Sequence, residues 1–391
     1  MTATHYANII SAWKILEEGT FEMKEKAINL LKNDTILIVS GLLAFISCFI
    51  ITPDSKYPSY INFRVLAILF SLMLVVSALI RIGTFDFLTS KLLGRIHSER
   101  YISLLLVVLS FFMSMLLTND VTLVTLVPFA INVLKEYKDR RRTMYTLILM
   151  TVSANLGSML TPIGNPQNLY LYSHYHMKLS SFIKLMLPYS AVSLILLVIS
   201  VFILNFTDKT LDTAEENETK APKMIPLFIY IALFIVCVLT VSNKLNYFIM
   251  LGIVAIVVLI CDRKAFRNVD YGLLLTFVFF FILIGNLGRI DFINSALSSI
   301  VDKNSMLTAV LSSQIISNVP AAMLLSTFTD NGEALVIGSN LGGLGTLIAS
   351  MASLITYKFF NSVKKEGEHY LLAFTIINVI FLAVLFLVQM I

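Results

Sequence analysis

Four short polar stretches interrupt otherwise apolar segments of this chain, and their residue types suit the binding of ions. They carry asparagine, threonine and serine side chains, with glycine and proline where a helix has to stop. Unpaired backbone groups are costly in an apolar medium, so such interruptions persist only where a ligand or water reaches them. Amide, hydroxyl and free carbonyl oxygens coordinate cations, whereas N–H groups at helix starts attract anions. The stretches are Thr118-Asn119-Asp120, Asn155 to Asn168, Ser317-Asn318-Val319-Pro320 and Ser339 to Thr346.

Asp120 is the most informative residue in these stretches. No other ionisable side chain lies between Tyr101 and Lys135. A buried carboxylate is costly unless a cation or a proton accompanies it, whereas an N-cap returns only about 1 kcal/mol. We therefore expect Asp120 to coordinate a cation or to carry a proton, with capping of the following helix as the alternative. The second tip has Val319 in that place, so an ion site there would use neutral oxygens, those of Ser313, Ser317 and Asn318.

Two of these stretches resemble helix starts. Proline at the first helical position, with asparagine just before it, restarts a helix. Asn165-Pro166 fits that signature, as does Val319-Pro320 together with Asn318. The sequence therefore predicts that a helix resumes at each of the two prolines.

The composition restricts the class of protein. The 391 residues include 29 Lys+Arg and 24 Asp+Glu, 57% are hydrophobic, 14% are charged, and the mean hydropathy is +0.85. Soluble domains carry about 25% charged residues, which excludes a cytosolic enzyme, a disordered protein and a nucleic-acid-binding protein. The three cysteines lack metal-like spacing and predict neither a disulfide framework nor a zinc site. The sequence predicts an all-α polytopic membrane protein.

Apolar runs long enough to cross a bilayer, about 17–25 residues, recur along the chain. They cover 34–51, 61–80, 143–172, 181–204, 224–242, 246–261, 271–288, 333–357 and 369–391. Two further apolar stretches, 101–134 and 305–328, are broken near the middle by polar residues. Lys and Arg mark the cytoplasmic loops of membrane proteins. Placing the basic loops inside requires these two stretches to be re-entrant hairpins that enter from opposite faces of the membrane.

The two halves of the chain resemble one another at three landmarks in the same order. Arg81 to Phe87 is echoed by Gly288 to Phe292, Thr118-Asn119-Asp120 by Ser317-Asn318-Val319, and Asn155 with Thr161 by Asn340 with Thr346. The extra crossing at 224–242 gives the halves opposite orientations. Inverted repeats whose broken helices meet near the midplane are typical of secondary transporters. The alternative is a helix bundle with coincidental kinks.

These features predict four parts of the chain. Residues 1–33 form an amphipathic segment on the membrane surface, and residues 205–223 form a polar cytoplasmic linker. Residues 34–204 form the first inverted repeat, with hairpin 101–134 and broken helix 143–172. Residues 224–391 contain a connecting helix and the second repeat, with hairpin 305–328 and broken helix 333–357. We expect the N-terminus in the cytoplasm and the C-terminus outside.

At these residues the sequence resembles the ion transporter superfamily, which includes divalent-anion/sodium symporters, arsenite permeases and related sodium/proton antiporters. The Ser-Asn-Thr hairpin tips of the symporters are similar to the two predicted tips. Their Gly-Gly and Thr-Leu-Ile-Gly-Thr-Pro-Pro-Asn stretch is similar to Gly157-Ser158 and Thr161-Pro162-Ile163-Gly164-Asn165-Pro166-Gln167-Asn168. The Asn-Asp pair and Thr-Pro-Ile-Gly are closer to the arsenite permeases. The similarity covers roughly residues 80 to 391.

The resemblance implies two pseudo-symmetric cation sites, with Na⁺ at Asn119, Asp120 and Asn318. One surrounds Thr118, Asn119 and Gly157, and the other surrounds Ser317, Asn318 and Gly342. A substrate would lie between the tips, within reach of Asn119, Thr161, Asn165, Asn168, Asn318 and Thr346. The resemblance also implies a homodimer with an elevator-like moving domain. Alternative roles stay open: close helix packing for the glycines, bonding to their own helix for the threonines, and interhelical hydrogen bonding for the tip asparagines.

The resulting prediction is a secondary active transporter that moves a small inorganic or organic anion across the cytoplasmic membrane, coupled to Na⁺ or H⁺. No Lys or Arg lies near the tips, so helix dipoles, amides and the coupling ion would hold the anion. A sodium/proton antiporter or an arsenite-type efflux permease is the alternative. A channel is disfavoured because Gly164-Asn165-Pro166-Gln167, which is similar to a water-channel motif, has no second copy. No cofactor and no enzyme activity are expected, since HExxH and Gly-x-Gly-Asp motifs do not occur.

Overall fold

A computed structural model describes residues 35–93, 96, 98–135, 139–204, 221–363 and 369–389. Every regular element in these ranges is a helix, which confirms the all-α prediction. The predicted surface segment 1–33 and nearly all of the predicted linker 205–223 lie outside the described residues. Five of the described helices are long and apolar enough to cross a membrane, as expected for a multi-pass membrane protein. They are Phe63–Arg81, Glu99–Leu117, Leu179–Leu204, Met224–Val241 and Tyr370–Val388.

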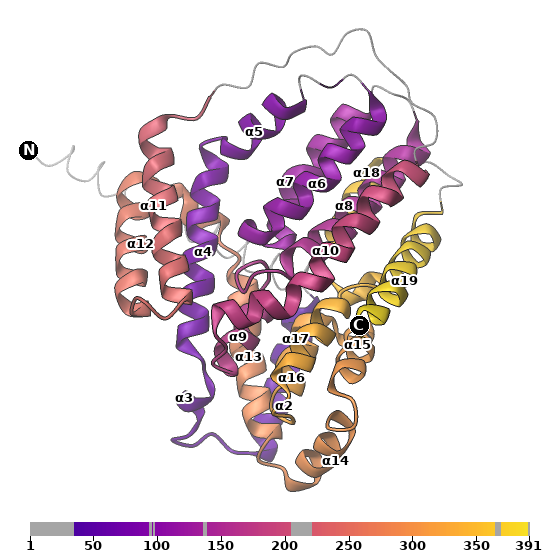
Figure 1. The fold of residues 1–391 in the computed structure, drawn as a ribbon. Coiled ribbons are helices and arrows are strands. Elements are labelled where there is room, and N and C mark those ends of the chain that lie inside the picture. The colour runs from indigo at the N-terminus through magenta and orange to yellow at the C-terminus, as the bar shows by residue number, and fades with distance from the viewer. Residues whose placement is uncertain are drawn as a thin grey trace, which may run out of the picture. The chain divides into compact units, whose positions relative to one another are not determined.

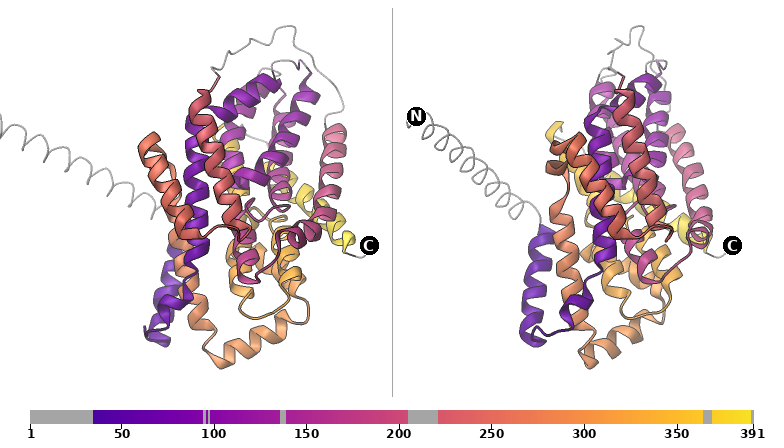
Figure 2. Two further views of the ribbon diagram at one scale, coloured as in Figure 1. Left: turned by 60° about the vertical axis from the view of Figure 1, so that its left-hand side comes forward. Right: turned by 90° about the vertical axis from the view of Figure 1, so that its left-hand side faces the viewer.

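The chain divides into two compact units, of which the smaller comprises Met1–Ile61 and Asp270–Arg289. Its described helices are α2 (Thr35–Ile50), α3 (Tyr57–Tyr60) and α13 (Tyr271–Leu287). Helix α13 packs along α2, and Figure 2 shows these two helices side by side. Near the end of α13, Asn286 donates hydrogen bonds of 2.9 Å to Ser47 Oγ and to the Tyr57 hydroxyl. These bonds give the buried Asn286 amide nitrogen two acceptors inside an otherwise apolar helix pair.

The larger unit, Asn62–Val269 and Ile290–Ile391, contains all four polar stretches. Its supporting helices include α4, which packs against α11 and α12. Arg81 at the end of α4 forms an ion pair of 2.6 Å with Asp262, which follows α12. The supporting helices are α4 (Phe63–Arg81), α5 (Thr84–Leu93), α10 (Leu179–Leu204), α11 (Met224–Val241), α12 (Tyr247–Cys261), η2 (Arg263–Asn268), α14 (Asp291–Val301) and α19 (Tyr370–Val388).

The first group of broken helices consists of α6 (Glu99–Leu117), α7 (Asn119–Leu134), α8 (Arg140–Ser158) and α9 (Pro166–His174). Figure 1 shows α6, α7 and α8 side by side, and each packs on the other two. A seam of small residues allows α6 and α8 to approach closely. Along this seam Thr146 donates to Ser103 Oγ at 2.9 Å, and Ser153 donates to the Val107 carbonyl oxygen at 2.6 Å.

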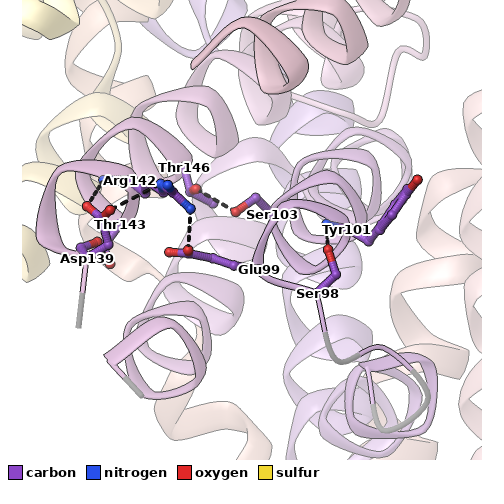
Figure 3. A network of polar contacts seen from close by, with 8 residues as sticks. All are labelled: Ser98, Glu99, Tyr101, Ser103, Asp139, Arg142, Thr143 and Thr146. Atoms are coloured by element: carbon purple, nitrogen blue, oxygen red, sulfur yellow. Dashed lines mark hydrogen bonds and ion pairs between the residues drawn. The ribbon is translucent and has the colours of Figure 1, made fainter. Parts of the chain in front are cut away.

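A buried ion pair closes one end of this seam. Glu99, in the first turn of α6, accepts a hydrogen bond of 2.6 Å from Arg142 in the first turn of α8. The Glu99 side chain is 0% exposed and that of Arg142 is 10% exposed. Arg142 also pairs with Asp139 at 3.1 Å, and Figure 3 shows this network next to the Ser103–Thr146 bond. The pair therefore joins α6 to α8 at their N-terminal ends.

The second group of broken helices follows the same order along the chain. It consists of α15 (Ser305–Ile316), α16 (Asn318–Leu325), α17 (Gly332–Leu341), η3 (Leu347–Ala349) and α18 (Met351–Val363). Helix α15 packs on α16 and α17, as α6 packs on α7 and α8. The two groups also exchange partners, because α9 packs against α16 and α17 whereas α18 packs against α7 and α8.

The helices stop at each of the four predicted polar stretches. Thr118 and Ser317 both have left-handed backbone conformations, with φ of 80° and 71°. Such a conformation costs a residue with a Cβ about 1–3 kcal/mol, so the surrounding contacts must impose it. In the stretch Asn155 to Asn168 (the first break) the Asn165 side chain caps α9 by accepting the Asn168 N–H, as predicted. The predicted restart at Pro320 is wrong, since α16 begins at Asn318 directly after the Ser317 bend.

Candidate functional site

Asn155 on α8 is the centre of a buried polar network. Its Oδ1 accepts hydrogen bonds from Asn119 Nδ2 at 2.9 Å and from Ser350 Oγ at 3.0 Å. Its Nδ2 donates to the Gly343 carbonyl oxygen at 3.4 Å. Asn155 therefore connects the first tip (Thr118–Asp120) to the second break (residues 342–350), which come from different halves of the sequence.

Asn340 on α17 forms a second centre. Its Oδ1 accepts a hydrogen bond of 3.1 Å from Asn165, the cap of α9, and its Nδ2 donates to Asn168 Oδ1 at 2.6 Å. Asn165 also donates to Ser158 Oγ at 3.2 Å. All four of these residues are at most 2% exposed. Asn165 and Asn168, both predicted to face a substrate, thus hold the second half of the chain through Asn340.

The first tip is held by backbone and side-chain bonds. The Asn119 N–H donates to the Gly164 carbonyl oxygen at 3.2 Å, and Asn119 Oδ1 accepts the Asp120 N–H at 3.0 Å. Thr118 precedes the first residue of α7, so Asp120 is not the N-cap and the capping alternative is wrong. Asp120 lies half-buried in the first turn of α7, where the helix dipole favours a negative charge.

The second tip (Ser317–Val319) lies against the second break. Ser317 donates to the Ala349 carbonyl oxygen at 3.4 Å. The Asn318 amide lies beside Gly343, where an added Cβ would be 2.9 Å from Asn318 Nδ2. Both tip side chains are buried, and Val319 is half-buried. Asn318 therefore approaches Gly343, and Asn119 is bonded to Asn155. Gly343 and Asn155 are themselves hydrogen-bonded to each other.

The two predicted substrate threonines contact the hairpin arms. Thr161 donates to the Met115 carbonyl oxygen on α6 at 2.5 Å, and Thr346 donates to the Gln314 carbonyl oxygen on α15 at 3.4 Å. The alternative, that each bonds only its own helix, is therefore wrong. Thr161 is half-buried and Thr346 is exposed. Neither hydroxyl has a hydrogen bond to the asparagine network among the described residues.

The predicted site glycines allow close helix approach. A Cβ on Gly157 would clash with the Phe111 carbonyl oxygen and would lie 2.6 Å from Ser114 Oγ on α6. A Cβ on Gly342 would clash with the Ser313 hydroxyl on α15. Ser313, a predicted cation ligand, donates to the Ala309 carbonyl oxygen at 2.7 Å. The packing role proposed as an alternative for both glycines therefore holds.

Replacing Gly157 by alanine is expected to destabilise the protein by about 1–3 kcal/mol, because α6 and α8 must move apart to admit the methyl group. The measurement is thermal unfolding in detergent. Gly252→Ala is the matched control, since Gly252 lies in α12 with nothing within 4 Å of its Cβ position. Alanine there is expected to leave stability unchanged or to raise it. Equal effects of the two substitutions would contradict the close approach.

Several polar residues in or near the network are missing from the predicted site residues. Ser350 lies ten residues after Asn340, as Asn165 lies ten residues after Asn155. That spacing could have identified it. Gln314 is the one carboxamide residue in the sequence between 305 and 316, which is a signal in an apolar segment. Asn340 is one of the predicted landmark residues but not one of the predicted site residues.

Replacing Asn155 by leucine is expected to destabilise the protein by about 1–3 kcal/mol for each donor that loses its acceptor. The donors concerned are the Asn119 amide and the Ser350 hydroxyl. Ser350→Ala removes only one of these two donors, so its effect on the unfolding temperature is expected to be smaller. If the two variants unfold at the same temperature, these bonds contribute little.

The described residues thus form a helical membrane protein whose polar interior consists of amides, hydroxyls and broken helices. No cluster of three or more His, Cys, Asp or Glu side chains occurs in the described part of the chain. Such an interior, built around half-helices, is typical of membrane transporters.

The comparisons with known proteins agree with this class. A family model described as citrate transporter (CitMHS) matches residues 23–331. The chain is 35% identical over 327 residues to an uncharacterized transporter of Methanocaldococcus jannaschii, which covers 83% of this chain and 88% of the relative. It is 30% identical over 331 residues to the inner membrane protein YbiR of Escherichia coli, covering 83% and 87%. A shorter match, 32% identical over 148 residues, is to the silicon efflux transporter LSI3 of Oryza sativa, covering 38% and 30%. The chain belongs to the citrate transporter family CitMHS, within the ion transporter superfamily.

Proposed function

We propose that this protein is a secondary active transporter that moves a small anion across the cytoplasmic membrane, coupled to Na⁺ or H⁺. In this proposal the two helix–break–helix pairs are re-entrant hairpins of an inverted repeat. The N-terminus is cytoplasmic and the C-terminus extracytoplasmic. Two copies form a homodimer in which one domain moves as an elevator.

The observation that carries this proposal is a set of hydrogen bonds that the two halves make in the same way. Ten residues after Asn155, the side chain of Asn165 donates to Asn340 at 3.1 Å. Ten residues after Asn340, the side chain of Ser350 donates to Asn155 at 3.0 Å. Each half therefore supplies the partner of the other half's landmark asparagine.

Two further contacts repeat in the same register. The threonine six residues after each landmark asparagine donates to the carbonyl oxygen four residues before each tip asparagine. The glycine two residues after each landmark asparagine faces the serine five residues before each tip asparagine. Helix α9 of the first half packs against α16 and α17 of the second half, and α18 of the second half packs against α7 and α8 of the first half. This agreement supports a pseudo-two-fold relation, because coincidental kinks have no reason to share their partners.

The electrostatics of the network support an anionic substrate with a coupling cation. Helices α7, α9, α16 and α18 all begin at residues of the network or next to them. Their N-terminal N–H groups carry partial positive charge and attract anions. Asp120 supplies the one carboxylate at either tip. A cation or proton at Asp120 would neutralise this charge and so make anion binding depend on the ion.

The test uses purified protein in proteoliposomes, with a Na⁺ gradient, a choline control or a pH gradient. Uptake of a panel of labelled small anions is expected only with one of the two ion gradients. Binding of a substrate without Na⁺ and without dependence on pH would contradict the proposal. Cross-linking in the same liposomes tests the homodimer.

A second candidate is an efflux permease of the arsenite type, or a sodium/proton antiporter. The partial match to a silicon efflux transporter motivates testing efflux of an uncharged, hydroxylated substrate beside uptake of an anion. Amides and hydroxyls suit such a substrate, since they donate and accept hydrogen bonds without charge. Adding neutral oxyacids to the flux panel, and recording which ion gradient collapses without any substrate, distinguishes these activities.

A further inference from the structure

Gln314 lies where three carbonyl oxygens meet, one turn before the second tip. Its Nε2 lies within hydrogen-bond distance of all three, those of Val310 (3.1 Å), Gly342 (3.1 Å) and Leu344 (2.9 Å), so its two N–H groups are shared among them. Its Oε1 accepts the Thr346 N–H at 2.9 Å. The carboxamide therefore joins the α15 arm to the irregular backbone of the second break, and both of its ends are used.

Gly345 makes room for this carboxamide. It has a φ of +109°, a conformation that residues with a side chain rarely adopt. A Cβ at this position would also clash with Gln314 Oε1. The loop conformation and the amide are thus matched to each other, and neither is explained by packing of apolar groups.

The first half has different residues at both positions. Four residues before the tip asparagine it has Met115 in place of Gln314, and five residues after the landmark asparagine it has Leu160 in place of Gly345. A thioether donates no hydrogen bond. The hairpin arm of the first half therefore brings no amide to its break, although the Thr161–Met115 bond matches the Thr346–Gln314 bond.

An amide reaches the first break from another element. Asn168 on α9 donates to the carbonyl oxygens of Met159 and Thr161, each at 3.3 Å. The residue at the matching position of the second half is Ser353, thirteen residues after Asn340. An amide donor thus reaches each break, from the hairpin arm (Gln314) in the second half and from α9 (Asn168) in the first half.

The half whose hairpin arm carries the amide has no charged residue at its tip, and the half whose hairpin arm lacks an amide has a carboxylate there. The first tip carries Asp120, and the second carries Val319. We propose that the Gln314 amino group takes the place of a bound cation in the second half, so that the coupling ion binds only in the half that carries Asp120. That the bound ion drives transport rests on the proposed function. Whether the Gln314 amino group lies where a cation would bind does not depend on it.

The physical reason is that converging carbonyl oxygens repel one another unless a positive group lies between them. A cation supplies that charge in transporters whose broken helices bind ions. An amide N–H group supplies partial positive charge permanently, without a full charge and without dissociating. The hairpin arm of the second half would then hold its break in every state of the transport cycle, whereas the hairpin arm of the first half, which has no such donor, would depend on the ion.

The test converts the amide into a carboxylate. Gln314→Glu replaces the donor by a negative group among carbonyl oxygens, so the variant is expected to require a cation in its place. Thermal unfolding in detergent at pH 8, without substrate, compares Na⁺ with choline. We expect Na⁺ to raise the unfolding temperature of Gln314→Glu by about 2–4 °C more than that of the wild type. Gln167→Glu is the matched control, since Gln167 is 2% exposed in α9 and makes no bond to these carbonyl oxygens.

Two results would overturn the inference. One is a Na⁺ response of Gln314→Glu no larger than that of Gln167→Glu. The other is an unfolding temperature of Gln314→Met equal to that of the wild type, because the methionine of the first half supplies no donor. If Gln314→Glu fails to fold, Gln314→Met alone decides. Failure of the proposed function is seen separately, as absence of ion-driven flux by the wild type. Where flux is present, its dependence on the driving ion is expected to have a Hill coefficient near one, and a value near two contradicts a single site.

Discussion

Replacing Asp120 by asparagine is expected to abolish the dependence of substrate binding on the coupling ion. The carboxylate is the one ionisable group at either tip, and it lies half-buried in the first turn of α7. Coupling free energies of 1–3 kcal/mol correspond to changes in affinity of about 5- to 150-fold, and we expect a change of this size to disappear. The measurement is the thermal shift caused by candidate anions with Na⁺ or choline at two pH values.

The control for Asp120→Asn is Asp291→Asn. Asp291 also lies in the first turn of a helix, α14, but it is exposed. Its substitution is expected to leave ion dependence unchanged. Asp120 lies in the first turn of α7, so Asp120→Asn is expected to lower stability through the helix dipole, by about 0.3–1 kcal/mol. Full ion dependence in Asp120→Asn would place the coupling site elsewhere in the chain.

Replacing Arg142 by methionine is expected to have the largest effect on stability, a loss of about 3–5 kcal/mol. The substitution removes the cation that pairs at 2.6 Å with Glu99, whose side chain is 0% exposed. A carboxylate left inside the helix bundle pays a desolvation cost that the pair had offset. Urea unfolding in detergent measures the loss, and the fraction of monodisperse protein reports whether the variant assembles.

Arg81→Met is the matched control for Arg142→Met. The Arg81–Asp262 pair has the same 2.6 Å separation, but its side chains are 31% and 17% exposed. Solvent screens such a pair, so its loss is expected to cost no more than about 1 kcal/mol. The double variant Glu99→Gln/Arg142→Met is expected to recover part of the stability, because no charge remains buried. Equal losses for Arg142→Met and Arg81→Met would contradict the role of burial.

The positions of the helix breaks could be predicted because they depend on local chemistry. A polar triplet such as Thr118-Asn119-Asp120 inside an apolar run has few places to put its side chains within an uninterrupted helix. Asn165 before Pro166 restarts a helix by a rule that involves only neighbouring residues, and the structure follows it. At the second tip the same rule fails by two residues, since Ser317 adopts a positive φ and α16 starts directly after it. Ser317 also bonds the Ala349 carbonyl oxygen, far along the chain, a contact that a rule on neighbouring residues does not contain.

The roles of individual polar side chains could not be predicted in the same way. Thr161 bonds α6 through Met115, and Gln314 bonds a loop about thirty residues further on through Gly342 and Leu344. The hydrogen-bond partner of each side chain depends on which helices and loops pack together. A sequence without a fold does not specify that choice.

The amino-acid sequence by itself determined that this protein is helical, lies in a membrane and interrupts its helices at four polar stretches. These properties follow from hydropathy and from local backbone chemistry, which act over one or two helical turns. The tertiary structure decided that Asn155 and Asn340 each receive a partner from the other half of the chain. It also decided that Gln314, and not only the tip residues, occupies a carbonyl-lined position. The physical reason is that a hydrogen bond depends on distance and angle, and between segments far apart in the sequence only the packing of helices sets both.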